Sequence, residues 1–223
     1  MLAWAGSWLF SGESFGDVVT PKEAKSRDDR RISIKLHKVI KQADIVIAHN
    51  GDKFDIKKMN WRFLIHALEP VLRYKSIDTL KKSRQVFGAT SQAMDFLCRQ
   101  LGYDTKHETD YGLWEKCEAG DKESLLRMHE YNKNDVFMLE DLYLRMRGWF
   151  KTHPSFSYMA DIYQPLENDE HRCTRCLHPI HDVKFTNQWT TPAGYVYAVA
   201  NCPECGAMMR KTVRKYRQSM SVK

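Results

Sequence analysis

The heptapeptide HNGDKFD, residues 49–55, places two acids, an amide and an imidazole directly behind the apolar run ADIVIA. An apolar run of this kind is typical of a strand buried on both faces, and ligand sites in open α/β sheets form beyond the carboxyl ends of strands. Asp55 is therefore a candidate metal ligand, and Gly51 would permit the close approach of a ligand. Two alternatives stay open, because Asn50 could cap the following helix and His49 could be an internally bonded turn histidine.

A second candidate carboxylate, Asp135, lies on a helix predicted from about residue 121 to residue 150. The other members of its face are apolar or aromatic: Met128, Tyr131, Leu139, Leu142 and Met146. A carboxylate among core residues is costly unless it is paired or binds a metal. The spacing thus favours a buried, metal-facing acid with Tyr131 one turn earlier. The alternative is an acid at the edge of the stripe that pairs with Lys or Arg.

Four cysteines form two CxxC pairs with 25 residues between them, Cys173 with Cys176 and Cys202 with Cys205. Two such pairs are typical of a tetrahedral structural zinc site. The segments between the pairs alternate like strands around PAG, so we predict a small β zinc ribbon whose folding requires the metal. His178 or His181 could replace one sulfur ligand.

The surrounding pattern predicts the elements that must position these residues. Strands are expected at 1–10 and 43–48, with a short one in the polar segment 12–28 and an edge strand at 74–78. Helices are expected at 30–42, 52–68, 79–88, 91–102 (capped by Ser91) and 121–150, with a polar loop over 103–120. This order predicts an α/β layered domain over 1–150, a linker over 151–171 and the ribbon with a basic tail over 172–223.

The charge of the chain bears on its partners. The formal net charge is +7, and the last 18 residues contain six Lys or Arg and no acid. Such a tail suits a polyanion, although a merely solvated tail has the same composition. The apolar runs are too short to span a bilayer, so we expect no membrane association and an intracellular, cytoplasmic location.

Two spaced motifs resemble a known family. N-x-x-x-F-D falls on Asn50, Phe54 and Asp55, and Y-x-x-x-D falls on Tyr131 and Asp135. In this order they resemble the second and third motifs of the DEDD 3′–5′ exonucleases, tyrosine subclass, of the ribonuclease-H-like superfamily. The stretches 74–102 and 113–146 are similar to the bacterial and phage branch related to family B polymerase exonuclease domains.

The resemblance implies a mixed sheet flanked by helices and a site of four carboxylates that holds two Mg²⁺ or Mn²⁺ ions, which together activate a water and steady the leaving oxygen. Asp55 and Asp135 would be two of these acids, and Tyr131 would orient the attacking water. The substrate, nucleic acid with a 3′ end and most simply DNA, would meet His49, Asn50 and Phe54. Replication or repair proteins are implied as further partners, in a bacterium or phage-infected cell.

The chain departs from the family at the first motif, because no Asp-x-Glu opens it. Its first expected strand resembles the family's second, and Glu13 and Asp17, the nearest acids, are poor substitutes. Asp78 does not match a catalytic motif and is expected to be structural. We therefore expect a domain that lacks its first strand and shows little or no activity alone. The alternative is a non-catalytic nucleic-acid-binding or replication-adaptor protein with a degenerate nuclease fold.

The basic stretch RKTVRKYR and three aromatic residues of the ribbon, Trp189, Tyr195 and Tyr197, suggest contact with nucleic acid. The alternative is that the aromatic rings form the small core of the ribbon.

Overall fold

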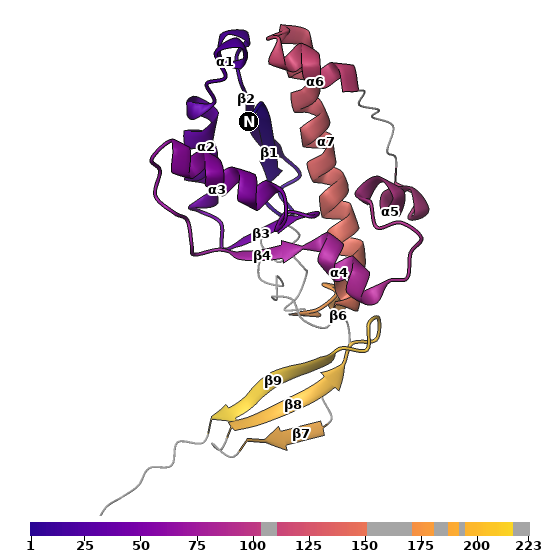
Figure 1. The fold of residues 1–223 in the computed structure, drawn as a ribbon. Helices are drawn as coiled ribbons and strands as arrows, with labels where there is room; N and C mark the ends of the chain where they lie inside the picture. Colours follow the sequence, from indigo (N-terminus) through magenta and orange to yellow (C-terminus); the bar gives the residue numbers. More distant parts are fainter. Residues whose placement is uncertain (104–110, 151–170, 181–186, 192–194, 216–223) are drawn as a thin grey trace, which may run out of the picture. The chain divides into compact units, whose positions relative to one another are not determined.

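The computed structural model describes residues 1–103, 111–150, 171–180, 187–191 and 195–215 (Figure 1). These residues belong to two compact units, Met1–Met146 and Arg147–Lys223. The expected linker lies outside the described residues, except for its last position, His171.

The N-terminal unit contains two short ladders. The strands β1 (Ala3–Ser7) and β2 (Ser14–Val18) pair antiparallel, while β3 (Ile45–Ala48) and β4 (Lys75–Asp78) pair parallel. The predicted mixed α/β architecture is thus confirmed. Within the described ranges each ladder has only two strands, so β1 and β3 each keep an edge without a hydrogen-bonded neighbour.

The open edge of β3 corrects one expectation. We expected ADIVIA to be fully buried, but every residue of β3 is half-buried, as is every residue of β1. A strand at the centre of a sheet loses solvent contact through neighbours on both sides. β3 has a neighbour on one side only, and its apolar side chains therefore stay partly accessible.

Seven helices and a short 3₁₀ turn complete the described part of this unit and its junction with the next. They are α1 (Pro21–Ser26), α2 (Arg30–Ile40), α3 (Asp55–Ile65), α4 (Thr79–Val86), α5 (Met94–Gln100), α6 (Tyr111–Glu118), α7 (Lys122–Met146) and the 3₁₀ turn Arg147–Trp149.

The helices α1 and α6 lie in segments that were expected to be polar loops. α1 begins with a capping box, in which the Thr20 hydroxyl accepts the Glu23 amide and the Glu23 carboxylate accepts the Thr20 amide, at 3.2 and 2.7 Å. This TPKE signature was visible in the sequence. In α6, Leu113 and Cys117 are buried one turn apart. Ser91 does not cap α5, whose N-cap is Ala93.

The helix α7 packs against both strands of the β1–β2 ladder (Figure 1). A side chain at Gly16 would collide with the Trp4 carbonyl and the His129 ring, so β2 can approach α7 this closely only with glycine there. The helix α2 also contacts this ladder, and the Trp4 indole donates to the Ile32 carbonyl at 3.0 Å. The cluster of buried residues here comprises Val19, Ala24, Ile32, Leu113, Cys117, Leu125 and Met128.

A buried carboxylate joins α2 to α3. Asp29, only 3% exposed, accepts from the Met1 amino group at 2.6 Å, from His66 at 2.7 Å and from Arg62. Desolvation opposes its charge, but the hydrogen bonds from Arg62, the amino terminus and His66 prevail and lower the pKa of Asp29 to about 2. Asp29 precedes α2, Arg62 lies on α3 and His66 directly follows α3, so the group fixes the helix that follows the 49–55 turn.

The C-terminal unit is built from short antiparallel strands. β5 (His171–Arg172) pairs with β6 (Pro179–Ile180), and β7 (Asn187–Thr190), β8 (Tyr195–Asn201) and β9 (Met208–Lys215) form a sheet in that order. The strands predicted on either side of PAG are present, whereas PAG itself lies outside the described residues. Part of the expected basic tail is strand β9. No described helix is long and apolar enough to cross a bilayer.

Candidate functional site

The turn 49–55 leaves β3 and enters α3. Asn50 adopts a left-handed backbone conformation (φ 63°), and its carbonyl accepts the amides of Lys53 and Phe54 at 3.2 and 3.1 Å. A side chain at the buried Gly51 would collide with Ala48. The described residues give α3 no side-chain cap, so Asn50 does not act as the capping residue of the alternative interpretation.

Asp78 anchors this turn to the second parallel strand. Its buried carboxylate accepts the amides of Asn50 (3.0 Å) and Asp52 (3.3 Å) from the turn, and those of Leu80 (3.0 Å) and Lys81 (3.2 Å) from the start of α4. One side chain thus joins the carboxyl ends of β3 and β4 and caps a helix, which is the structural role expected for it.

Replacing Asp78 with Ala is expected to lower the free energy of unfolding of the N-terminal unit by about 3 kcal/mol, because a helix cap and two turn amides lose their buried acceptor. The matched control is Asp52→Ala, which removes an exposed pair with Lys81 (2.6 Å) and should cost less than about 1 kcal/mol. Urea unfolding followed by circular dichroism measures both. Equal losses in the two variants would show that Asp78 does not anchor the turn.

His49 is bonded inside the protein at both ring nitrogens. Nδ1 lies 2.9 Å from the Thr79 hydroxyl and Nε2 lies 2.9 Å from the Gln92 carbonyl. Burial lowers the pKa of His49. Nε2 donates to the Gln92 carbonyl, which can only accept, and the Thr79 hydroxyl in turn donates to the Ala48 carbonyl at 3.2 Å. This geometry supports the alternative of a turn histidine that positions its neighbours.

Asp55 is the first residue of α3 and is exposed to solvent. Desolvation of its carboxyl raises its pKa, and the nearby Asp78 carboxylate adds to this, while its own amide and Lys58 act in the opposite direction. A bound cation would stabilise the charged form of such a carboxylate, and solvent exposure leaves the carboxylate accessible to a cation. The Phe54 ring beside it is 51% exposed, with the Lys58 ammonium 3.8 Å from the ring centre.

Tyr131 and Asp135 lie one turn apart on α7, as predicted. The apolar stripe is buried at its two ends, at Met128, Leu142 and Met146, but every residue from 131 to 140 is half-buried. Asp135 is therefore not the buried acid that the periodicity indicated, because periodicity reports the direction of a side chain and not what covers it. Asp135 helps to raise the pKa of Cys98 to about 11, after desolvation, Asp95 and Asp141.

The described acids form no cluster of three. Among the described residues, one group of three or more His, Cys, Asp or Glu side chains has its ligand atoms within 4.8 Å of one another, and that group consists of cysteines. Asp17 is held by Arg31 at 2.7 Å and Lys35 at 2.6 Å, with its pKa lowered by these bonds against desolvation, and Glu13 is exposed. Neither Asp17 nor Glu13 is thus grouped with two further acids among the described residues.

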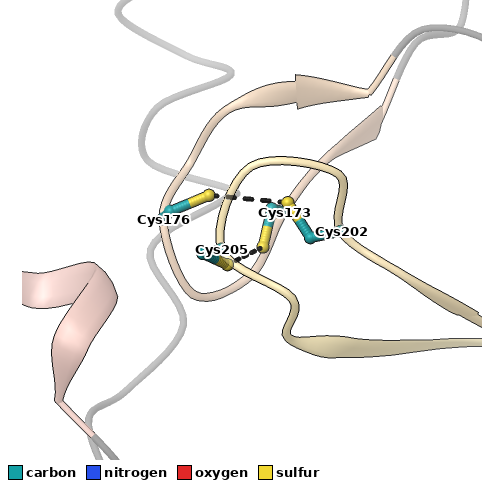
Figure 2. A group of neighbouring side chains, drawn as sticks. All are labelled: Cys173, Cys176, Cys202 and Cys205. Carbon is teal, nitrogen blue, oxygen red and sulfur yellow. Dashed lines mark hydrogen bonds between the residues drawn. The ribbon is translucent and has the colours of Figure 1, made fainter.

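The cysteine group is Cys173, Cys176, Cys202 and Cys205, and Figure 2 shows their sulfurs directed toward a common centre. The Sγ–Sγ distances of the pairs 173–205 and 176–202 are both 3.7 Å. A disulfide would be about 2.0 Å long, whereas a tetrahedron with metal–sulfur bonds of about 2.3 Å has edges of about 3.8 Å. The four thiols thus fit a tetrahedral metal ion.

The two CxxC turns have matching backbone conformations and hydrogen bonds. Leu177 and Gly206, which follow the second cysteine of each pair, have φ of 66° and 67°, and their amides donate to the Cys173 and Cys202 carbonyls at 2.9 Å. The Arg175 amide lies 3.4 Å from the Cys173 sulfur. His178 is outside the group of ligand atoms, and His181 lies outside the described residues.

The pKa values of the thiols are shifted in different directions. Desolvation raises the pKa of Cys176 and Cys205. Desolvation also acts on Cys173, but there the amides of Cys176 and Arg175 prevail and lower the pKa. Thiolates are the ligands of zinc, so metal binding must displace protons from the buried thiols.

Comparison with known proteins adds two findings. The profile described as the RNase_H superfamily matches residues 5–147, which is well over half of the chain. The DNA polymerase III PolC-type of Ureaplasma parvum serovar 3 is 26% identical over 140 residues, which make up 61% of this chain and 9% of that protein. The chain therefore spans less than a tenth of the length of this relative. No solved structure matches the chain.

Proposed function

The chain belongs to the RNase H superfamily, and we propose that residues 1–150 form the greater part of a 3′–5′ exonuclease domain of the DEDD type, tyrosine subclass. Its substrate would be nucleic acid with a 3′ end, and DNA is favoured because the relative is a DNA polymerase. Replication or repair proteins would be its further partners.

One observation carries this proposal: the 49–55 turn is fastened where β3 and β4 end side by side and delivers Asp55 to that edge. This edge is where α/β sheets bind ligands. Asp55 remains accessible with a raised pKa, and the exposed Phe54 ring with Lys58 beside it suits a terminal base and its phosphate. We assign substrate contact to Asn50 and Phe54. His49, predicted as a third contact, would instead position the turn through its bonds to Thr79 and Gln92.

The complete site would hold two Mg²⁺ or Mn²⁺ ions, with Asp55 and Asp135 as ligands and Tyr131 oriented toward the attacking water. Among the described residues no three acids lie together, so the other two ligands of such a site are not in view. In the same residues β1 and β3 each have an edge without a hydrogen-bonded neighbour. A strand carrying Asp-x-Glu and paired with these edges would supply both the missing hydrogen bonds and the missing charges.

We further propose that the four cysteines hold one structural Zn²⁺ ion. All four donors are sulfur and their separations fit a tetrahedron, which is the arrangement of closed structural zinc sites. The C-terminal unit would then be a zinc ribbon.

The competing function is a non-catalytic nucleic-acid-binding or replication-adaptor protein. The absence of any cluster of three acids among the described residues favours it. Binding of DNA that survives the loss of both Asp55 and Asp135 would support this alternative, provided that no form of the chain cleaves.

The experiment that tests the exonuclease proposal adds a strand. A short apolar strand containing Asp-x-Glu is joined ahead of Met1 by a tight turn, so that it can pair with β1. The fusion turns the Met1 amino group into an amide, and Arg62 and His66 remain as the charged or polar partners of Asp29. We expect this chimera to gain Mg²⁺-dependent trimming of 3′-labelled single-stranded DNA. The matched chimera with Asn-x-Gln, and the active chimera with Asp55→Asn or Asp135→Asn, should all be inactive. An inactive but folded Asp-x-Glu chimera would count against the proposal.

A further inference from the structure

Three aromatic rings form a continuous strip on the sheet of the C-terminal unit. Trp189 on β7 lies directly opposite Tyr197 on β8, and Tyr195, two residues earlier on β8, lies on the same face. The Trp189 and Tyr197 ring centres are 6.1 Å apart, and those of Tyr195 and Tyr197 are 6.4 Å apart, with interplanar angles of 28° and 20°. We call these three residues the aromatic strip.

The aromatic strip is not the core of the unit. The cluster of buried residues in its described part is Cys173, Ile180, Cys202 and Met209, and Ala200 packs against it from β8. Ala198, between Tyr197 and Ala200, is buried on that same side of β8, opposite to the aromatic strip. Trp189 keeps 52% of its surface exposed. The described buried cluster of the ribbon therefore lies on the face of β8 opposite to the aromatic strip.

A cation lies beside the aromatic strip. The Arg210 guanidinium lies 5.1 Å from the centre of the Tyr197 ring. Arg210 belongs to β9, whose sequence MMRKTVRK is half basic, in a chain of net charge +7. The strip thus offers one exposed ring, Trp189, and two half-buried rings, Tyr195 and Tyr197, beside a cation. Accessible rings beside a cation are the arrangement that binds unpaired bases, with the bases stacked on the rings and the phosphates near the positive charge.

We propose that the aromatic strip with Arg210 is a binding site for single-stranded nucleic acid. A duplex already covers the faces of its bases by stacking, so only an unpaired strand can place bases on these rings. Stacking accepts every base, so the site should have little sequence preference. The inference rests on the proposed nuclease function, because a 3′–5′ exonuclease must hold an unpaired strand near its end, but it assigns the holding to the C-terminal unit.

The test uses the full chain, loaded with zinc, in EDTA-free buffer without Mg²⁺, so that cleavage plays no part. Binding of fluorescein-labelled oligothymidine is followed by fluorescence anisotropy. We expect Trp189→Ala and Tyr197→Ala each to weaken binding by roughly tenfold, which is the loss of one stacked base. Trp189→Phe should retain most of the affinity. Arg210→Ala should reduce the slope of log Kd against log salt by about one.

The matched control is Trp114→Ala, which removes a tryptophan of the N-terminal unit that is 51% exposed, nearly the same as Trp189. The affinity of this variant for oligothymidine should stay within about twofold of that of the unmodified chain, because no stacked base is lost. A second measurement does not depend on any variant: the same sequence as a duplex should compete at least about tenfold less well, because its bases are not free to stack.

The inference would be overturned if the two strip variants bound oligothymidine as tightly as the Trp114 control, with unchanged zinc content and circular dichroism. Equally strong competition by the duplex would also overturn it. The exonuclease proposal would stand or fall separately, because the chimera is scored by cleavage and this site by binding without Mg²⁺.

Discussion

Removing the metal from the four-cysteine group is expected to unfold the C-terminal unit while Met1–Met146 stays folded. The buried cluster of the described C-terminal unit consists of four residues, two of which are cysteines of the metal group. Such a core provides little burial of apolar surface, and small domains of this kind depend on a metal or on disulfides. Structural zinc contributes roughly 10–16 kcal/mol in zinc-finger peptides, which far exceeds what this core supplies.

The variant that tests this is Cys202→Ser, which removes one ligand from a buried position. We expect zinc content to fall from one ion per chain to none, and the amide resonances of the C-terminal unit to collapse into the narrow range of an unfolded chain. Treatment with a strong chelator should reproduce this result. Resonances of the N-terminal unit should hardly move, because its cores are formed from its own residues.

The control is His178→Ala. His178 belongs to the same turn region but lies outside the group of ligand atoms, so the variant should keep its zinc and its dispersed spectrum. Loss of zinc in this variant would mean that the histidine is a ligand. A C-terminal unit that remains folded after chelation would show that the metal does not hold it together.

The cysteine group could be predicted because the spacing of each CxxC pair is local and limits what the four thiols can do. The location of the 49–55 turn could also be predicted, since it follows directly from the strand that precedes it. The anchoring of this turn by Asp78 could not be predicted from the sequence. Asp78 contacts the turn amides across 26 and 28 residues of sequence, and no local pattern reports a bond of that range.

Burial was the property that the sequence predicted least well. Ile45–Ala48 and the segment around Asp135 both look like core, because their apolar periodicity is strong. Whether a face is covered depends on a neighbouring element, and the described residues leave the edge of β3 and residues 131–140 only partly covered. Both discrepancies concern residues of the proposed nuclease site, which is the place where a further strand would change the burial.

Residues 1–223 alone are expected to show no Mg²⁺- or Mn²⁺-dependent trimming of DNA above the level of their own Asp135→Asn variant. Two ions need several carboxylates to hold them about 3.5–4 Å apart, and the described residues bring no three acids together. Losing several kcal/mol of transition-state stabilisation corresponds to a rate at least about a thousandfold lower than that of a complete site.

The measurement is product formation on 3′-labelled single-stranded DNA with either ion, comparing the unmodified chain, Asp55→Asn and Asp135→Asn. All three should give the same background rate. The Asp-x-Glu chimera serves as the positive control, since it shares every other residue. Robust trimming by the unmodified chain that Asp135→Asn abolishes would show that acids other than the family pair complete the site. The open edges of β1 and β3 would then need a different explanation, because the charges expected from a strand between them would already be present.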